Sequence, residues 1–583
     1  MAHNALRSRT LPRTATALVT SGSVLALGAG AGALAAALLA APAGAATFTV
    51  LNNNDNGAGS LRQAIIDANA AAGNDTIDFA PGLTDSIVLA SDLPTITDGL
   101  TITGPGTSAL TITGVHAFHI FDIATLGSSD VVISGLTLEG SVGLVDGTGD
   151  IVGGAIRSVD TPLTLEDVQI LNSAATSNSS DSMGGAVFVQ NAPGTGNVSI
   201  RSSVFARNVA TATNTGDKGG GGGLWIQADN ISLEGSALFD NEADAGGGAY
   251  LFATGQLTID DSLIEENHAH FYTGGLLAGA GAVLLTDSVI SGNVSDNAIG
   301  GIYVGAATPT MSGTARLQVS NTRISDNTAT QLGGGLLFNL DGTSYVDRAT
   351  ITGNSGTQLG GLDVFGPMEM TSSTISNNSG IGINVGYGFG PVSNSVCSTS
   401  TGALQPESPG PRPPDQVTIS NTTVSGNSGE GITVDAPYLS TGSVAVAPGA
   451  FAPARQLSPA ACGTPSLSAT LTLKHVLAAD NVGTDVNGPS FSLFSLIETP
   501  SPEVFPGYGT IFGADPELLP LQQISDTVSV VPIPIGSTAW NAGWPDFTPP
   551  PSTDQRGLPR VVDIIDIGAY EIQEPGLAPR FTG

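Results

Sequence analysis

The sequence is poor in several residue types that carry much of protein chemistry. Its 583 residues include two cysteines, two lysines and 5% aromatic residues, and charged residues make up 11%. So few cysteines exclude a disulfide-dense scaffold and a site built from several thiolate ligands. The shortage of lysine and aromatic side chains argues against a ring-lined cleft for sugars.

Basic residues are far fewer than acidic residues. Seventeen Lys and Arg residues face 50 Asp and Glu residues, and the formal net charge is −33. A surface this acidic repels nucleic acid and anionic lipid, so we expect neither as a partner. The charge is compatible with an extracellular protein and with cation binding.

Long apolar runs are confined to the first 46 residues. A start with three arginines precedes an Ala-, Leu- and Val-rich run, which ends in "APAGAAT" (41–47). This order predicts a secretory signal peptide cleaved near Ala45 or Ala46. An uncleaved membrane anchor is the alternative. No later stretch is long enough to span a bilayer, so we expect a secreted or cell-surface protein with no span in the mature chain.

Glycine is abundant, with 78 residues, and it recurs in one phrase. The stretch "ISDNTATQLGGGLLF" (324–338) shows the phrase as an apolar residue, a small polar pair, an asparagine, a gap and two or three glycines. The asparagines of its copies are Asn172, Asn208, Asn241, Asn267, Asn293, Asn327, Asn354, Asn378, Asn427 and Asn481, with Gly140 in that place in an earlier copy. A recurring unit of variable length, upward of about 24 residues, is typical of a solenoid.

Each unit also carries short runs that alternate apolar and polar residues, such as "LQVSN" (317–321). These runs read as strands and are too short and too often interrupted by glycine for helices. A β-sandwich would give similar strands without a fixed Asn-to-Gly phrase. The sequence therefore predicts an all-β protein with one parallel β-helix solenoid.

The repeated phrase has a structural explanation. Asparagine tolerates a left-handed corner, and stacked asparagine amides can bond one another in a ladder. We expect such a ladder at Asn241, Asn267, Asn293, Asn327, Asn354, Asn378 and Asn427. The apolar residue three positions earlier should point inward, as at Leu238, Ile264, Ile290, Ile324, Ile351, Ile375 and Val424. The glycines would allow tight inward turns.

An N-terminal cap is expected where the solenoid would otherwise expose its first coil. Ser60 and Gln63 have capping-box spacing, and Leu61, Ile65 and Ala68 share one helical face. A short amphipathic helix covering the open core is the simplest interpretation.

Two parts of the chain resemble a known group. The stretch "GSLRQAIIDAN" (59–69) resembles the CSLREA-type N-terminal motif of secreted bacterial β-helix proteins, with Gly59 and Gln63 in place of the motif's Cys and Glu. "GADPELLPL" (513–521), "GSTAWNAG" (536–543) and "DQRGLPRVVDIIDIGAYE" (554–571) resemble the C-terminal choice-of-anchor Q domain, which follows right-handed β-helices of the pectin-lyase-like superfamily. The resemblance implies a right-handed helix and a secreted or surface protein, and no established activity.

These observations divide the chain into four regions. They are a signal peptide (1–46), an N-terminal cap with the first coils (47–130), the repeats (131–490) and a C-terminal cap module resembling choice-of-anchor Q (491–583). The repeats carry Pro/Ser-rich insertions at 386–416 and 436–466.

The C-terminal module concentrates charges of both signs. The charged residues of its last motif, 554–571, are Asp554, Arg556, Arg560, Asp563, Asp566 and Glu571. We expect a buried arginine–carboxylate network that fixes the end of the rod. A role in wall attachment or cation binding is the alternative.

Evidence for catalysis is weak. The densest titratable stretch, 260–272, offers Glu265, Glu266 and His268 as acid–base candidates. The two positions before the repeat asparagine also accept Gly, Asp and Phe elsewhere, which favours a solvated corner. We expect no cofactor, with Ca²⁺ between the stacked acids Asp240 and Glu266 as the open alternative. A second group, Asp341, Asp347, Arg348 and Asp363, offers acids and a base on neighbouring coils, with Arg207 and Lys218 as bases elsewhere.

The sequence favours a binding role. Cys397 and Cys462 lie in the two insertions and are candidates for a disulfide. We expect a structural or adhesive rod whose loops bind an extracellular glycan or surface protein. The alternative is a polysaccharide lyase or glycoside hydrolase, since related folds host both. The oligomeric state stays open.

Overall fold

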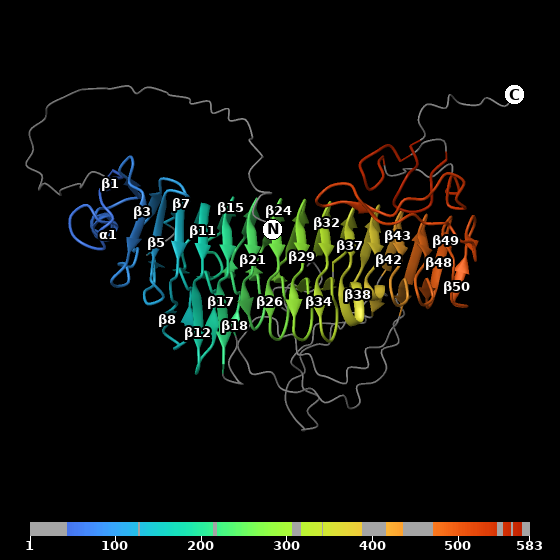
Figure 1. The fold of residues 1–583 in the computed structure, drawn as a ribbon, viewed down its shortest axis with the longest axis horizontal. Coiled ribbons are helices and arrows are strands. Elements are labelled where there is room, and N and C mark those ends of the chain that lie inside the picture. The colour runs from blue at the N-terminus through green and yellow to red at the C-terminus, as the bar shows by residue number, and fades with distance from the viewer. Residues whose placement is uncertain are drawn as a thin grey trace, which may run out of the picture. The chain divides into compact units, whose positions relative to one another are not determined.

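A computed structural model describes residues 44–125, 129–213, 219–305, 316–340, 342–386, 416–434, 470–544, 552–560 and 564–573. These residues form an elongated all-β rod of stacked coils with one helix, a parallel β-helix as predicted (Figure 1). Within this described part, no helix is long and apolar enough to cross a membrane.

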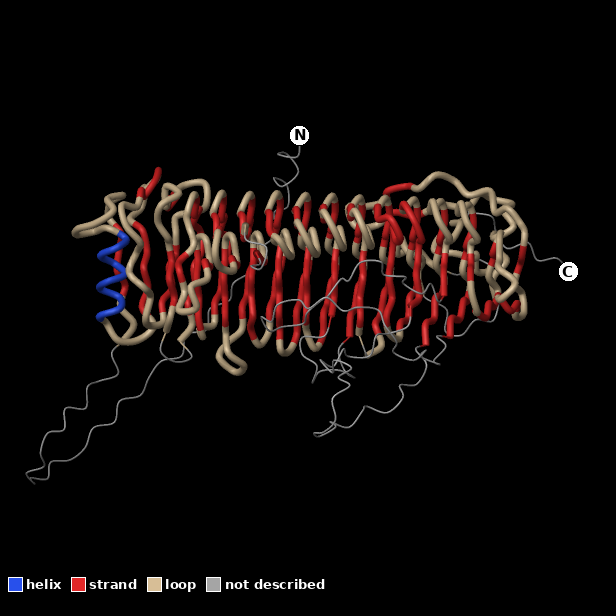
Figure 2. Tube along the Cα trace, turned by 90° about the horizontal axis from the view of Figure 1, so that it is seen from below, coloured by secondary structure: helices blue, strands red, loops and turns tan. Residues whose placement is uncertain are grey.

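A full coil contains four strands, each paired in parallel with its counterparts in the neighbouring coils (Figure 2). One such coil consists of β24 (Gln256–Asp260), β25 (Leu263–Glu265), β26 (His268–Ala269) and β27 (Leu276–Gly279). The strands therefore stack in four rows along the rod, named here in the order in which a coil visits them.

The first two rows form one long sheet. The first row contains β1 (Thr47–Val50), β2 (Asp75–Phe79), β4 (Leu100–Thr103), the starts of β7 (Val131–Glu139) and β11 (Leu163–Leu171), β15 (Val198–Arg201), β20 (Ile231–Glu234), β24, β28 (Ala282–Thr286), β32 (Arg316–Ser320), β36 (Ser344–Asp347), β39 (Met368–Thr371), β42 (Gln416–Ser420), β45 (Thr470–Lys474), β48 (Ser490–Leu493) and β50 (Val504–Pro506). The second row contains β3 (Asp85–Val88), β5 (Leu110–Thr113), the ends of β7 and β11, β16 (Val204–Ala206), β21 (Ala237–Phe239), β25, β29 (Val289–Ser291), β33 (Arg323–Ser325), β37 (Thr350–Thr352), β40 (Thr374–Ser376), β43 (Thr423–Ser425), β46 (Leu477–Ala479), β49 (Leu496–Ile497) and β51 (Ile511–Phe512).

The other two rows form the opposite wall. The third row contains β12 (Ala174–Ser177), β17 (Val209–Ala212), β22 (Glu242–Ala243), β26, β30 (Val294–Ser295) and β34 (Thr328–Ala329). The fourth row contains β6 (Phe121–Ile123), β10 (Ile156–Val159), β14 (Val187–Gln190), β19 (Leu224–Ala228), β23 (Ala249–Ala253), β27, β31 (Ile302–Gly305), β35 (Leu336–Asn339), β38 (Ser355–Phe365), β41 (Ser379–Gly386), β44 (Ile432–Val434) and β47 (Val486–Asn487). Small accessory sheets contain β8 (Leu144–Val145), β9 (Ile151–Val152), β13 (Ser182–Met183) and β18 (Gly219–Gly220), and β52 (Gln522–Gln523) with β53 (Ser529–Val530).

One continuous apolar core runs through the rod. The predicted inward row of the second strands is in register and fully buried, for example at Leu238, Ile264 and Ile290. Alternation along each strand sends the next side chains to solvent, so a coil needs few apolar residues to bury its interior.

A buried asparagine ladder lies at the corner between the second and third rows. Its members are Asn208, Asn241, Asn267, Asn293, Asn327, Asn354, Asn378, Asn427 and Asn481. The backbone N–H and the Nδ2 of each member donate to Oδ1 of the next, at 2.8–3.1 Å. The second Nδ2 hydrogen goes to a backbone carbonyl of the preceding coil, such as Ile264 for Asn293. Each of these buried amides is therefore fully used, as a buried polar group must be.

The glycines of the phrase pack against this ladder. A Cβ placed on Gly275 would lie 2.6 Å from the Gly301 carbonyl oxygen and 3.1 Å from Cγ of Asn293. The same approach recurs at Gly248, Gly301 and Gly335. The phrase pairs asparagine with glycine because the backbone carbonyl of the next coil, together with the asparagine amide, leaves no room for a side chain here.

The left-handed corner belongs to the residue before each ladder asparagine, which corrects our expectation. Asp240, Glu266 and Asp326 have φ values of 54°, 54° and 58°. Asn172, with φ 53°, occupies this corner position, and Ser173 next to it donates its N–H to Asn208 Oδ1 at 3.0 Å. The alignment of Asn172 with the other repeat asparagines was therefore wrong by one residue.

The assignment of Gly140 was wrong in the same way. Gly140, with φ 60°, lies at the corner, and Ser141, which follows it, donates to Ser173 through its hydroxyl at 2.8 Å. Both corner and ladder positions accept asparagine, so the phrase alone did not separate them.

The N-terminal end is covered by the helix that the sequence predicts. α1 (Leu61–Ala70) buries Leu61, Ala64, Ile65 and Ala68 against the first coils. The Oγ of Ser60 accepts the backbone N–H of Gln63 at 3.2 Å. The Gln63 side chain donates to Asp67 instead, so half of the expected capping box forms.

The described residues of the C-terminal module that follow β51, from residue 513 on, contact the side of the rod. The module runs back along the outer side of the second row (Figure 1). Ser529 exchanges hydrogen bonds with Thr350 on β37, Gln555 contacts Thr374 on β40, and the N–H of Ala569 donates to Thr423 on β43. The module therefore braces several coils laterally.

Removal of one central amide tests the ladder. Asn293→Ala should leave the N–H and Nδ2 of Asn267 without their acceptor and the Ile264 carbonyl without its donor. Because each unpaired buried group costs about 1–3 kcal/mol, we expect a loss of roughly 3 kcal/mol, measured by urea unfolding. The exposed amide Gln318, changed to alanine, is the control and should alter stability by less than about 0.5 kcal/mol. Equal effects of the two changes would contradict the ladder's role.

Candidate functional site

Two histidines and two carboxylates meet on the outer face of the third row. His270 Nε2 lies 2.9 Å from Oε1 of Glu242, and its Nδ1 lies 3.2 Å from Oδ2 of Asp296. His268 Nε2 lies 3.0 Å from Oδ1 of the same Asp296. The two imidazole rings are edge to face, with centroids 4.7 Å apart. We call these four residues the histidine–carboxylate cluster.

The cluster is built by stacking. Glu242 on β22 pairs in register with His268 on β26. His270 and Asp296 are 26 residues apart and lie just beyond β26 and β30 in consecutive coils. Side chains that are remote in the sequence therefore stand beside one another on the wall, separated by one inter-strand spacing of about 4.8 Å.

The electrostatics of the cluster favour a charged imidazole. Partial burial alone would lower the pKa of His270, but hydrogen bonds with Asp296 and Glu242 and the nearby charge of Asp244 raise it overall. The hydrogen bond from His268, together with that from His270, lowers the pKa of Asp296. The four side chains are part-exposed, so the cluster is open to solvent.

The sequence identified only His268 of this cluster as a candidate. Glu265 accepts a hydrogen bond from the Ser291 hydroxyl at 3.0 Å, and Glu266 lies exposed at its left-handed corner. Neither belongs to the cluster. The missed residues had a signal, because Glu242 and His268, and His270 and Asp296, are each separated by one repeat of 26 residues.

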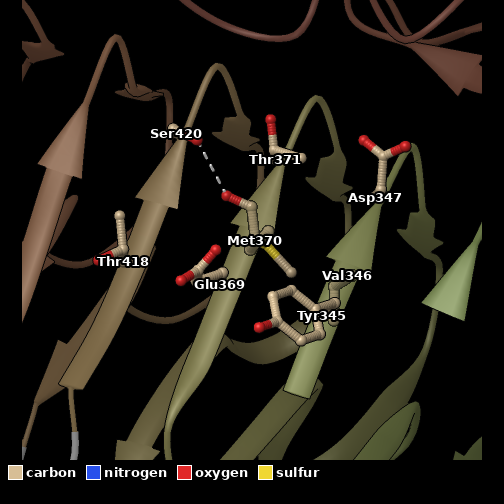
Figure 3. Close-up of a pocket in the computed structure, with 8 residues that line it drawn as sticks. All are labelled: Tyr345, Val346, Asp347, Glu369, Met370, Thr371, Thr418 and Ser420. Carbon is tan, nitrogen blue, oxygen red and sulfur yellow. Dashed lines mark hydrogen bonds between the residues drawn. The ribbon is translucent and has the colours of Figure 1, made fainter. Parts of the chain in front are cut away.

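A shallow hollow lies on the outer face of the first row (Figure 3). It has a volume of about 150 Å³ and is lined by Tyr345, Val346, Asp347, Glu369, Met370, Thr371, Thr418 and Ser420. Ligand pockets usually exceed roughly 300 Å³, so the hollow could hold only a small part of a chain-like ligand.

The candidate group of acids and base on neighbouring coils divides between two walls. Asp347 on β36 accepts a hydrogen bond from Arg348 Nε at 3.1 Å, and burial raises the pKa of Asp347 despite that partner. Asp363 lies on β38 in the opposite wall and accepts from Asn384 Nδ2 at 2.9 Å. The three residues therefore do not form one site.

A group of acids includes Asp480, the residue directly before the last ladder asparagine, Asn481. Carboxylate oxygens of Asp480, Glu498 and Asp515 lie within 4.8 Å of one another. Burial, and then the charges of its neighbours, raises the pKa of Asp480. Asp485 ends the ladder by accepting from Asn481 Nδ2 at 2.7 Å. Oxygen ligands of this kind suit Ca²⁺. The calcium site predicted from the sequence lies elsewhere, between Asp240 and Glu266, and stays a prediction.

The predicted C-terminal charges form a buried network. Asp554 accepts from Arg556 Nε at 2.8 Å and from Arg556 Nη2 at 2.6 Å, and also from the backbone N–H of Glu571. The Arg556 guanidinium lies 3.8 Å from the ring centroid of Tyr570. These contacts fold the end of the module on itself.

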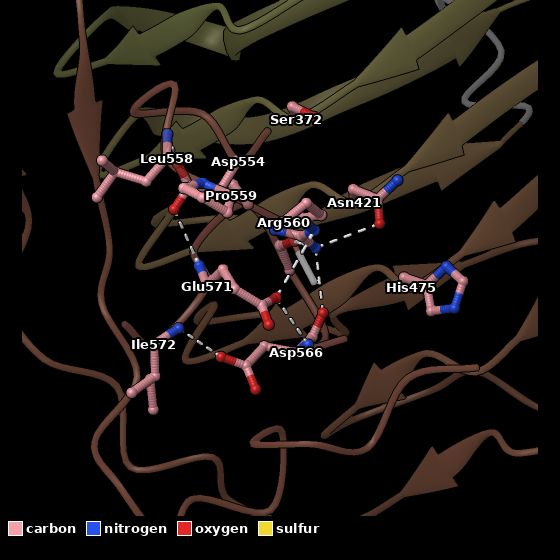
Figure 4. A network of polar contacts seen from close by, with 12 residues as sticks. Ser372, Asn421, His475, Asp554, Leu558, Pro559, Arg560, Asp566, Glu571 and Ile572 are labelled. Atoms are coloured by element: carbon pink, nitrogen blue, oxygen red, sulfur yellow. Dashed lines mark hydrogen bonds and ion pairs between the residues drawn. The ribbon is translucent and has the colours of Figure 1, made fainter. Parts of the chain in front are cut away.

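Arg560 connects that network to the rod (Figure 4). It is fully buried, donates to Asn421 Oδ1 at 3.2 Å and to the carbonyl of Asp566 at 3.1 Å, and its Nε lies 3.9 Å from Oε2 of Glu571. Asp566 accepts the backbone N–H of Asn541 at 2.7 Å and that of Ile572 at 2.7 Å. Burial raises the pKa of Asp566, although these bonds oppose the change. This arrangement positions the module and offers no open catalytic group.

Some predicted residues lie outside the described part of the chain. These are Lys218, Asp341, Cys397, Cys462, Asp563 and the signal peptide up to residue 43. The strands on either side of the two cysteine-bearing segments are neighbours, because β41 pairs with β44 and β42 pairs with β45. A Cys397–Cys462 disulfide stays a prediction.

Comparison with known proteins identifies no family for this chain. No family model and no curated protein matches the chain. The chain is similar to the periplasmic alginate epimerase AlgG at 11% identity and a TM-score of 0.32, over 71% of this chain and 77% of that one. It is similar to the A-module of the Azotobacter vinelandii mannuronan C-5 epimerase AlgE6 at 12% identity and a TM-score of 0.30, over 80% and 94%. Values this low support no inference about activity.

Loss of Arg560 should detach the module without unfolding the rod. Arg560→Met leaves Glu571 and Asp566 without their buried cation, which costs about 3–5 kcal/mol in comparable networks. Trp540 and Trp544 lie in the module, so their fluorescence and its susceptibility to protease report detachment. Arg201→Ala is the control, because Arg201 forms an exposed ion pair with Glu234. It should change neither the tryptophan fluorescence nor the susceptibility to protease. An undisturbed module in Arg560→Met would contradict this role.

Docking of the module should also depend on pH. His475 accepts the backbone N–H of Trp544 through Nε2 at 2.9 Å and must be neutral to do so. Burial, with the charges of Arg560 and Lys474, lowers its pKa from 6.5 to about 4. Docking is therefore complete above pH 6.5 and weakens as the pH falls towards about 4, by roughly 3 kcal/mol at most.

The pH dependence can be assigned to this side chain. Tryptophan fluorescence of wild type and His475→Asn is followed from pH 8 to pH 4. Asparagine accepts the left-handed backbone of this position, so the variant should fold but lose that part of the transition. The same transition in both proteins would show that another group causes it.

Proposed function

We propose that the protein is a secreted or cell-surface rod that binds an extracellular partner through segments inserted along one edge. One observation carries this proposal. The chain leaves a fourth-row strand and re-enters a first-row strand around each of the segments 126–128, 306–315, 387–415 and 435–469. All of these insertions therefore begin and end at the same corner of a coil.

The rod gives these insertions a fixed base. Elsewhere the same corner is closed by two residues, as between β27 and β28 or between β38 and β39. The two longest insertions leave adjacent coils, so their ends stand side by side. Segments carried on a rigid scaffold are the usual place for binding residues. The partner class is an extracellular glycan or a surface protein.

Secretion and attachment belong to the same proposal. They are supported by the basic and apolar order of residues 1–46 and by the resemblance of the N- and C-terminal motifs to secreted β-helix proteins. The C-terminal module packs on the side of the rod. Within the described residues, the last strands, β50 and β51, each pair with a strand of the preceding coil only. β50 ends in Pro506, which has no N–H to donate and so limits pairing at this edge.

A polysaccharide lyase or glycoside hydrolase is the second candidate. It is favoured by the hollow of Figure 3, where the exposed ring of Tyr345 lies beside the Glu369 carboxylate, with Asp347 further along the same strand as Tyr345. Such groups could contact a sugar ring and exchange protons with it.

Deletion of the insertions tests binding. A variant replaces 387–415 and 435–469 by the two-residue connection Ala280–Gly281, which closes the same corner elsewhere. Wild type and variant are passed over immobilised neutral and acidic polysaccharides and over bacterial cells, with and without Ca²⁺. We expect the wild type to be retained on at least one probe and the variant to pass over the same probe without being retained. Equal thermal stability of the two proteins would show that the variant is folded.

The same samples are assayed for new reducing ends and unsaturated products. If wild type degrades a polysaccharide and Glu369→Gln abolishes this activity, the protein is a polysaccharide-active enzyme. The proposal of a binding rod would then be wrong. Retention that persists in the deletion variant, or no retention of wild type on any probe, would contradict the proposal.

A further inference from the structure

The histidine–carboxylate cluster has the composition of a transition-metal site. Carboxylate and imidazole atoms of Glu242, His268 and His270 lie within 4.8 Å of one another. Two imidazoles and one carboxylate are a common ligand set for Zn²⁺, whereas Ca²⁺ prefers oxygen ligands only. This donor set differs from the all-acidic group at Asp480.

The distances are close to those that a metal requires. Zinc bonds of about 2.0–2.1 Å in a tetrahedron separate ligand atoms by about 3.3 Å. His270 Nε2 and Glu242 Oε1 are 2.9 Å apart, so an ion can enter between them with small side-chain movements. The side chains are part-exposed, which gives the ion a path from solvent.

Asp296 supplies the orientation that metal-binding histidines usually have. Its Oδ2 lies 3.2 Å from His270 Nδ1, which leaves Nε2 directed at Glu242. A carboxylate on the far nitrogen fixes the tautomer and makes the imidazole a better ligand. Asp296 also contacts His268, so one carboxylate positions both rings.

The backbone holds this arrangement in place. Glu242, His268 and Asp296 belong to consecutive coils, whose strands β22, β26 and β30 are paired in register. The ladder asparagines Asn241, Asn267 and Asn293 immediately precede those strands and fix the height of each coil. Two of the ligands, Glu242 and His268, are thus mounted on rigid strands, and His270 follows directly after β26.

We propose that Glu242, His268 and His270 bind one Zn²⁺ ion on the outer wall, with Asp296 as a positioning residue. The ion joins two adjacent coils and leaves an open position towards solvent. This site does not involve the inserted segments. The zinc proposal and the proposal of a binding rod can therefore each fail without contradicting the other.

Zinc titration of the tag-free, chelator-treated protein tests the site. Isothermal calorimetry at pH 7.5 should show one Zn²⁺ per chain, and Ca²⁺ should not compete. His268→Ala and His270→Ala should each remove this binding. Asp296→Asn should weaken it about 10–100-fold, as loss of such a partner does elsewhere. Co²⁺ should give the visible absorption of a nitrogen- and oxygen-ligated ion in wild type and not in His270→Ala.

Two variants serve as controls. His116→Ala removes an exposed histidine of another coil, and Glu265→Gln alters a neighbouring carboxylate outside the cluster; both should bind Zn²⁺ as wild type does. Melting of all variants without metal shows that they are folded. Absence of saturable Zn²⁺ binding, or unchanged affinity in His268→Ala and His270→Ala, would overturn the proposal.

Discussion

The buried asparagine ladder is the constraint on which the other features depend. A buried amide is tolerated only when its donors and acceptors are used, and here the partners of each amide lie in the adjacent coils. A coil that slipped by one residue would orphan two amides and turn the inward isoleucine row to solvent. The ladder thus sets the register of every strand in its coils, and the glycines opposite it follow from the space it occupies.

A fixed register decides where variation can occur. Residues can be added only where the chain is between rows, and the long additions are placed between the fourth and first rows. It also decides how polar groups meet. Glu242 and His268 are adjacent because they are one repeat apart, so polar side chains on the outer wall meet between neighbouring coils.

Much of the fold could be predicted from the sequence. The inward residues Ile264 and Ile290 and the helix that begins at Leu61 follow from periodicity and capping rules that act locally. The corner was harder, because asparagine suits both the ladder and the left-handed position before it, as Asn172 shows. The lateral seat of the module could not be predicted, since it depends on small outward threonines such as Thr350 and Thr374, whose alignment appears only after the coils stack. His270 and Asp296 were missed as a pair because their contact needs the repeat length at that exact position in the stack.

Hydrogen–deuterium exchange, read by mass spectrometry on residues 44–583, tests the ladder most directly. The account predicts that the backbone N–H groups of Asn208 to Asn427, each bonded to the next amide, exchange slowly and to a similar extent along the rod. The turn between β8 and β9 should exchange quickly. Ladder peptides that exchange as fast as this turn, or a sharp loss of protection between two adjacent coils, would contradict it.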